Sequence, residues 1–177
     1  MTSRIERLHR LREGTQVEMG RALGPTPTSH HPSLAVLPFA NLSGDPEQEY
    51  FSDGITEDLI TDLSKIPGLF VLARNSTFAF KGEAVDVREL GSRLGVRHVI
   101  EGSVRRSGQR VRITAQLIDA ATGGHLWAER YDRELTDIFA VQDEITARIV
   151  GSLRITLLHA RASVGSGTRR VEAYDLV

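Results

Sequence analysis

The stretch LAVLPFANLSGDPEQEYFSDGITEDLITDL, residues 34–63, joins an apolar segment, an acidic segment and an amphipathic segment without a break. Residues 33–39 are apolar at almost every position, which is typical of a strand that is buried on both faces of a sheet. After the acidic segment, Ile55, Leu59 and Leu63 recur with helical spacing, and Ser52 or Asp53 is expected to cap that helix. The stretch therefore predicts a strand, a loop and a helix, the basic unit of an α/β fold.

A second strand and a short helix are expected next. Residues 69–73, LFVLA, are apolar throughout and follow the Pro67-Gly68 stop signal. In VDVRELGSRLGV, residues 85–96, Asp86 and Glu89 match a capping pair at a helix start, and Gly95 suits the left-handed residue at its end.

From His98 onward, apolar and polar residues alternate on both sides of a serine–glycine pair, which predicts an antiparallel hairpin. A two-residue turn at Ser107-Gly108 would pair Val104 with Val111 and direct both toward the core. The opposite, solvent-facing side is then expected to carry Glu101, Ser103, Arg105, Arg110, Arg112, Thr114 and Gln116.

A further strand, HLWAERYD (residues 125–132), and a long helix that starts near Thr136-Asp137 complete the pattern. The predicted order is β-α-β-α-β-β-β-α. The fold class is α/β with a mixed five-stranded sheet, in which the first three strands are parallel, the hairpin strands are antiparallel, and a long C-terminal helix follows.

Four segments are predicted along the chain. Residues 1–23 have the apolar spacing of a helix, and residues 24–32 have the proline-rich, polar composition of a linker. The α/β domain is expected to cover residues 33–162. Residues 163–177 contain a second linker, SVGSG at 163–167, and the start of a further helical region.

Composition limits the possible functions. The chain has 177 residues, a formal net charge of −1, 40% apolar and 25% charged residues, and no cysteine. These values predict a globular domain without disulfides, without cysteine-ligated zinc and without a general attraction to nucleic acid. No apolar run approaches the roughly 20 residues that a membrane-spanning helix needs. No catalytic residue, metal ligand or cofactor site is predicted.

Two charged surfaces are the candidate sites. Arg105, Arg110 and Arg112 share one face of the predicted hairpin, where several cations could contact an anionic partner. No aromatic residue lies between them, so base stacking and nucleic-acid binding are not expected. The second candidate surface is the acidic segment with Asp45, Glu47 and Glu49; a divalent cation is the alternative there, although the spacing does not match an EF-hand.

Two long segments carry a family resemblance. They are LAVLPFANLSGDPEQEYFSDGITEDLITDLSKIPGLFVLARNSTFAFKG (residues 34–82) and LGVRHVIEGSVRRSGQRVRITAQLIDAATGGHLWAERYDREL (residues 94–135). They resemble the bacterial TolB amino-terminal-like domain, a module also similar to FlgO-type proteins. In that family the domain accompanies adenylate or guanylate cyclase, winged-helix or protein kinase domains, and it precedes tetratricopeptide repeats. The segment VEAYDLV (residues 171–177) resembles the start of such repeats.

The resemblance implies a non-catalytic interaction or signal-relay module whose partners are proteins: flanking domains or a second copy. The N-terminal stretch MTSRIERLHRLREG has no apolar core of signal-peptide type, so a cytoplasmic location is expected, or a periplasmic one if the full-length protein carries a membrane anchor. The alternative hypothesis is a domain that senses a small ligand, a nucleotide or a divalent ion.

Overall fold

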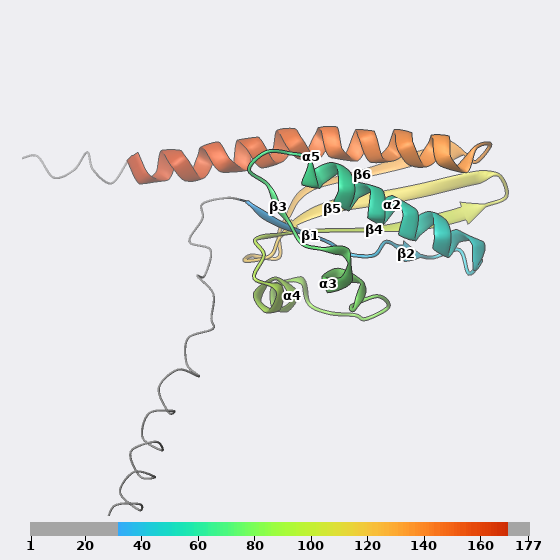
Figure 1. Ribbon diagram of the computed structural model, residues 1–177, viewed down its shortest axis with the longest axis horizontal. Coiled ribbons are helices and arrows are strands. Elements are labelled where there is room, and N and C mark those ends of the chain that lie inside the picture. Colours follow the sequence, from blue (N-terminus) through green and yellow to red (C-terminus); the bar gives the residue numbers. More distant parts are fainter. Residues whose placement is uncertain (1–31, 170–177) are drawn as a thin grey trace, which may run out of the picture. The chain divides into compact units, whose positions relative to one another are not determined.

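A six-stranded mixed sheet forms the centre of the computed structural model, which describes residues 32–169 of the chain and their side chains as far as residue 162 (Figure 1). The strands are β1 (Ser33–Val36), β2 (Ala40–Asn41), β3 (Phe70–Val71), β4 (His98–Ser107), β5 (Arg110–Asp119) and β6 (His125–Glu134). The helices are α2 (Glu47–Ser64), α3 (Arg74–Phe78), α4 (Val87–Leu94) and α5 (Ile138–Arg169). The predicted α/β class with a mixed sheet and a long C-terminal helix is confirmed.

The strand order is β3-β1-β4-β5-β6, with the short β2 pairing beside β1 on the same edge of β4. Strand β1 is parallel to β3 and to β4, whereas β4, β5 and β6 form an antiparallel meander, as expected. Helices α2 and α5 cover one face of the sheet, and α3 and α4 lie on the other side (Figure 1).

The main core lies between the sheet and the α2–α5 layer. Helix α2 buries Phe51, Ile55, Leu59 and Leu63, while α5 buries residues with the same helical spacing from Val141 to Leu157. A smaller cluster on the opposite face packs Leu90 of α4 against the first residues of β4. The rest of that face, along β4, β5 and β6, carries no helix and stays open (Figure 1).

Strands β1 and β2 are one strand interrupted by a bulge. Val36 pairs with Ile100 and Ala40 pairs with Ser103, so four steps along β1–β2 match three steps along β4. Pro38, inside the bulge, has no N–H to pair. The next N–H, that of Phe39, leaves the sheet and donates to Oγ1 of the buried Thr56 in α2, at 3.0 Å. The bulge explains why the sheet has six strands where the sequence predicted five.

The predicted hairpin turn is wrong by one residue. Ser107 pairs with Arg110, so Gly108 and Gln109 form the turn, and Val104 pairs with Ile113 in place of Val111. Gly108 has a φ of 61°, which a type II′ turn requires at its first central position. The pairing changes by two residues, an even number, and therefore the predicted division into a buried face and an open face is retained.

Helix α2 begins at Glu47, six residues before the start that a cap at Ser52 would give. Asp45 accepts a hydrogen bond from the Glu47 N–H through Oδ1 at 3.0 Å, and Pro46 is the capping residue. Ser52, expected as a cap, is buried inside the helix, where its hydroxyl donates to the carbonyl of Gln48. The acidic first turn with Glu47 and Glu49 suits the positive end of the helix dipole, which explains the earlier start.

Three other boundaries differ or extend. The predicted strand 69–73 shortens to Phe70–Val71, and α3 replaces a segment for which no element was predicted. Helix α4 is capped as predicted, by the Asp86 side chain and by Gly95 with a φ of 67°.

Helix α5 continues through residues 163–167, where a linker was predicted; the domain boundary at 162 stays a prediction. Residues 1–31 and 170–177 lie outside the described residues, so the predicted helical segment 1–23, the linker up to residue 31 and most of the following helical start are not described.

Candidate functional site

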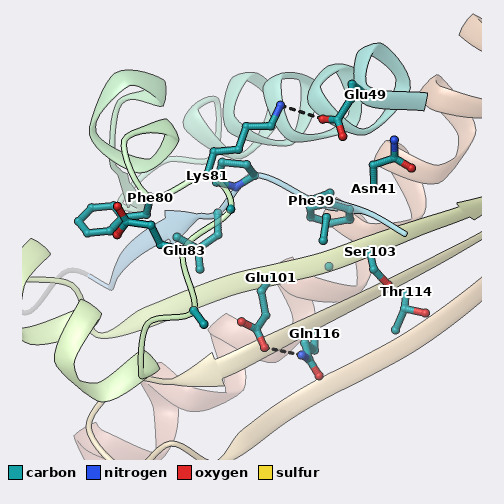
Figure 2. Close-up of a pocket in the computed structure, with 16 residues that line it drawn as sticks. Phe39, Asn41, Glu49, Phe80, Lys81, Glu83, Glu101, Ser103, Thr114 and Gln116 are labelled. Carbon is teal, nitrogen blue, oxygen red and sulfur yellow. Dashed lines mark hydrogen bonds and ion pairs between the residues drawn. The ribbon is translucent and has the colours of Figure 1, made fainter. Parts of the chain in front are cut away.

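A cavity of about 540 Å³ opens beside the β1–β2 bulge (Figure 2). Three parts of the chain line it: the bulge with its neighbours (residues 37–41), the loop between α3 and α4 (residues 80–84), and the open face of β4 and β5. Because these parts are far apart in sequence, only the folded sheet brings them together. The bulge turns residues 37–39 out of the regular strand and thereby shapes one wall of the cavity.

An ion-pair cluster holds the α3–α4 loop to α2 at the edge of this cavity. The Lys81 Nζ lies 2.8 Å from both carboxylate oxygens of Asp53 and 3.0 Å from Oε2 of Glu49 (Figure 2 shows the Glu49 pair). The hydrogen bond to Asp53 raises the pKa of Lys81, and the hydrogen bond from Lys81 lowers the pKa of Glu49. Lys81 therefore stays charged and connects the α3–α4 loop to α2.

The floor of the cavity is polar. Gln116 of β5 donates a short hydrogen bond from Nε2 to Oε1 of Glu101 across the strand pair, and Ser103 lies opposite Thr114 (Figure 2). Glu83 and Glu49 also reach the lining, so carboxylates outnumber the single lysine. Leu37 and Phe80 add apolar surface. Such a lining suits a small polar or cationic group better than an anion.

The open face brings Arg105, Arg110 and Arg112 together, as the sequence predicted, but it is not a surface of one charge. Strand β6 places Asp132 opposite Arg112 and Glu134 opposite Arg110. Arg112 binds Asp132 through two hydrogen bonds, of 2.7 and 3.0 Å, and this contact lowers the pKa of the Asp132 carboxyl. These two carboxylates were not predicted, because their position opposite the arginines depends on the register of β6; the alternation in HLWAERYDRE carried the signal.

The acidic segment does not act as one unit. Asp45 accepts a hydrogen bond from the Glu47 N–H just before α2, Glu47 lies exposed in the first turn, and Glu49 binds Lys81. Within residues 32–169, no three His, Asp or Glu side chains converge in a way that could hold a metal ion. Lys81, Asp53, Glu101 and Gln116 were not predicted as site residues, because no local spacing connects positions so far apart.

The comparisons with known proteins decide the family. Residues 29–148 match the family model described as "HilA/YgeH-like transcriptional regulator, second domain". The chain belongs to this family. A protein of Rhizobium meliloti (strain 1021) named "Putative adenylate cyclase 3" is 63% identical over 148 residues, which is 82% of this chain and 25% of that protein. The chain thus spans about a quarter of the length of this relative.

The fold is shared with a solved structure. Lipoprotein GNA1162 from Neisseria meningitidis is 21% identical with a TM-score of 0.51, covering 69% of this chain and 96% of that one. TolB from Acinetobacter baumannii is 17% identical with a TM-score of 0.49, covering 70% of this chain and 28% of that one. The predicted resemblance is confirmed, and it rests on the family match and on the cyclase-named relative. In the part of the chain that the structure describes, no helix has the length and apolarity to span a bilayer.

Replacing Lys81 by Met should loosen the α3–α4 loop, because Asp53 and Glu49 lose the cation that connects them to it. Hydrogen exchange should rise across residues 79–86, while exchange in β4 and β5 stays unchanged. Lys65→Met is the matched control, since Lys65 pairs only within its own helix end, with Asp62. Equal exchange in residues 79–86 of both variants would contradict the role of Lys81.

Acid should have a similar, weaker effect. Because the folded-state pKa of Glu49 is lowered, its stabilising contact is complete above its ordinary value of 4.5 and is lost as the pH falls through the lowered value. Exchange of the loop, corrected for intrinsic rates, should therefore rise in the wild type as the pH falls below the ordinary value of 4.5 and through the lowered pKa of Glu49. Glu49→Gln should reduce this pH dependence.

Proposed function

We propose that this chain is a non-catalytic interaction module that relays a signal between an effector domain and other parts of a multidomain bacterial protein. The supporting observation is its place among known proteins: it belongs to a family of second domains of regulators, and it matches only a quarter of a much longer relative named as a cyclase. The effector would be a cyclase, winged-helix or kinase domain, with tetratricopeptide repeats on the other side.

The site supports a non-catalytic role. A lysine that acts as a nucleophile needs a lowered pKa, whereas the pKa of Lys81 is raised by its two carboxylate partners. Glu101 is engaged by Gln116, and Glu49 by Lys81. The ionisable groups of the cavity thus hold structural elements together, and the broad open face of the sheet remains for contact with another protein.

We narrow the proposed arginine surface to two residues, because Arg112 already has a partner. Arg112 is neutralised by Asp132, whereas Arg105 and Arg110 are exposed and form no ion pair with any described residue. A cation that is already paired gains little from a new partner. Arg105 and Arg110 are therefore the residues we assign to partner binding on the open face.

Charge reversal at Arg105 and Arg110 together should slow association with the partner and leave the melting temperature nearly unchanged, because exposed charges contribute little to stability. The measurement is surface plasmon resonance against the remaining domains of the full-length protein, at low and high salt. The difference from wild type should shrink at high salt. Arg154→Asp with Arg161→Asp, on exposed positions of α5, is the control. Wild-type association rates in the Arg105 and Arg110 variant at both salt levels would remove these arginines from the proposed surface.

The cavity supports a second candidate function, the sensing of a small ligand. Its volume lies in the range of small-molecule sites, and its excess of carboxylates favours an amine or another small cation. Thermal-shift measurements with amines, nucleotides and divalent ions test this: a ligand at 100 times its Kd adds about 2.7 kcal/mol of stability. The shift should disappear in Glu101→Gln, and the absence of any shift with the wild type would exclude this function for the compounds tested.

A further inference from the structure

Strand β6 is a long edge strand with a free hydrogen-bonding side. Its ten residues pair with β5 alone among the described residues. The Leu135 N–H donates to the Gln109 carbonyl, which sets the phase of the β5–β6 ladder: odd-numbered residues of β6 bond to β5. The backbone N–H and C=O groups of Ala128, Arg130, Asp132 and Glu134 therefore point away from the sheet. Such an edge is a template for another strand.

The charges on β6 have an unusual order. One residue to either side of Tyr131 are Arg130 and Asp132, and two residues to either side are Glu129 and Arg133. At one step and at two steps from Tyr131, the residues on its two sides thus carry opposite charge, whereas at three steps Glu134 corresponds to the uncharged Ala128. Charges that only keep an edge strand soluble have no need of this symmetry.

We propose that two copies of this chain associate through antiparallel pairing of their β6 strands, with the two-fold axis at Tyr131. In this register Arg130 lies opposite the partner's Asp132, and Glu129 lies opposite the partner's Arg133, each contact occurring twice. The outward-pointing backbone groups of Ala128 and Arg130 then lie opposite those of the partner's Glu134 and the partner's Asp132. The two residues of each pair exchange two N–H···O=C hydrogen bonds. This proposal goes beyond the relay function and does not depend on it.

The neighbouring registers are unfavourable. Only residues whose backbone groups point away from the sheet can form hydrogen bonds with the second copy. The two-fold axis must therefore pass through a residue of β6 and not between two residues. An axis at Arg130 places Arg130 opposite itself, and an axis at Asp132 places Asp132 opposite itself. Like charges directly opposite each other destabilise a strand pair, so the charge pattern selects the register centred on Tyr131.

The side chains are available for these contacts. Arg130 is exposed and forms no ion pair within residues 32–169, and Glu129 is exposed, with the Tyr131 hydroxyl as its hydrogen-bond donor at 3.2 Å. Asp132 and Arg133 already have partners in their own chain, Arg112 and Glu144, which hold them in place. A second copy would thus add one ion to each existing pair.

Helix α5 provides a second, independent observation. Glu144 binds Arg133 of β6, and Ser152 lies beside the Tyr131 hydroxyl, so this side of α5 faces the free edge. Continuing from Glu144 with helical spacing, Gly151, Ile155 and Leu158 follow on the same side. Ile155 is 60% exposed and Leu158 is 58% exposed. This apolar stripe has no partner within its own domain.

Gly151 fits close approach of a second helix. A Cβ atom at this position would meet nothing within 4 Å, so the packing of one chain does not require glycine, which costs helix stability. The two-fold axis at Tyr131 puts both copies of α5 on the same face of the joined sheet, side by side, and they come nearest close to Ser152. A missing side chain at Gly151 leaves room there, and Ile155 and Leu158 become covered.

Sedimentation velocity on the full chain tests the proposal. The wild type should be a dimer. The variant Arg130→Asp sets two carboxylates opposite each other at both contacts with the partner's Asp132, and Asp132→Arg sets two guanidinium groups opposite each other at both contacts with the partner's Arg130. Each variant alone should dimerise at least about tenfold more weakly than the wild type. An equimolar mixture of the two variants restores every opposite-charge contact, so a heterodimer of about wild-type affinity should form.

Two further variants complete the test. Lys65→Asp makes the same change of charge at the end of α2, away from the β6 edge, and should leave the dimer unchanged. Gly151→Arg should abolish the dimer while the melt of the monomer is retained or raised, since the position is open and arginine favours helix. A wild-type chain that is monomeric at about 100 μM, single variants that dimerise normally, or a mixture that stays monomeric would each overturn the proposal.

Discussion

The hydrogen bond from the Phe39 N–H to the Thr56 hydroxyl connects the interrupted strand to the helix layer. Pro38 breaks the ladder between β1 and β4, and the following amide would be a buried donor without an acceptor if Thr56 were absent. The Thr56 hydroxyl donates in turn to the Ser52 carbonyl, so a side chain within α2 serves both the helix and the strand. This contact joins the bulge to α2, in addition to the apolar residues that α2 packs on the sheet.

The position of the neighbouring groups follows from that contact. Phe39 is buried, and its ring lies against Gly102; a Cβ there would come within 2.4 Å of the ring and within 2.5 Å of the Thr114 carbonyl oxygen. Glycine at 102 is therefore required by close approach and not by a turn. With the bulge held in this way, Glu49 and Asp53 of α2 lie within reach of Lys81, and the cavity acquires its wall and its rim. The open face of β4–β6 stays uncovered by any described helix.

Local patterns predicted most of the fold. The alternation around Gly108 gave the correct buried and open faces of the hairpin, and Asp86 and Gly95 marked α4 because caps depend on neighbouring residues only. Three features were not predicted: the bulge, helix α3, and the early start of α2. Each depends on a partner distant in sequence or on the choice between equivalent caps. The same limit applies to the site. Lys81 and Asp53 are 28 residues apart, and the opposition of Arg112 to Asp132 depends on the register of β6, so neither contact is visible in local spacing.

The most direct test of this account is the exchange of the Phe39 amide in Thr56→Val and Thr56→Ser. Valine matches threonine in shape but removes the acceptor, so the buried Phe39 N–H is left unsatisfied at a cost of about 1–3 kcal/mol. Serine keeps the hydroxyl and loses one methyl group. The account predicts that Thr56→Val lowers the unfolding free energy more than Thr56→Ser does, and that only Thr56→Val accelerates exchange of the Phe39 amide. Equal protection of that amide in both variants, with Thr56→Val at least as stable as Thr56→Ser, would contradict it.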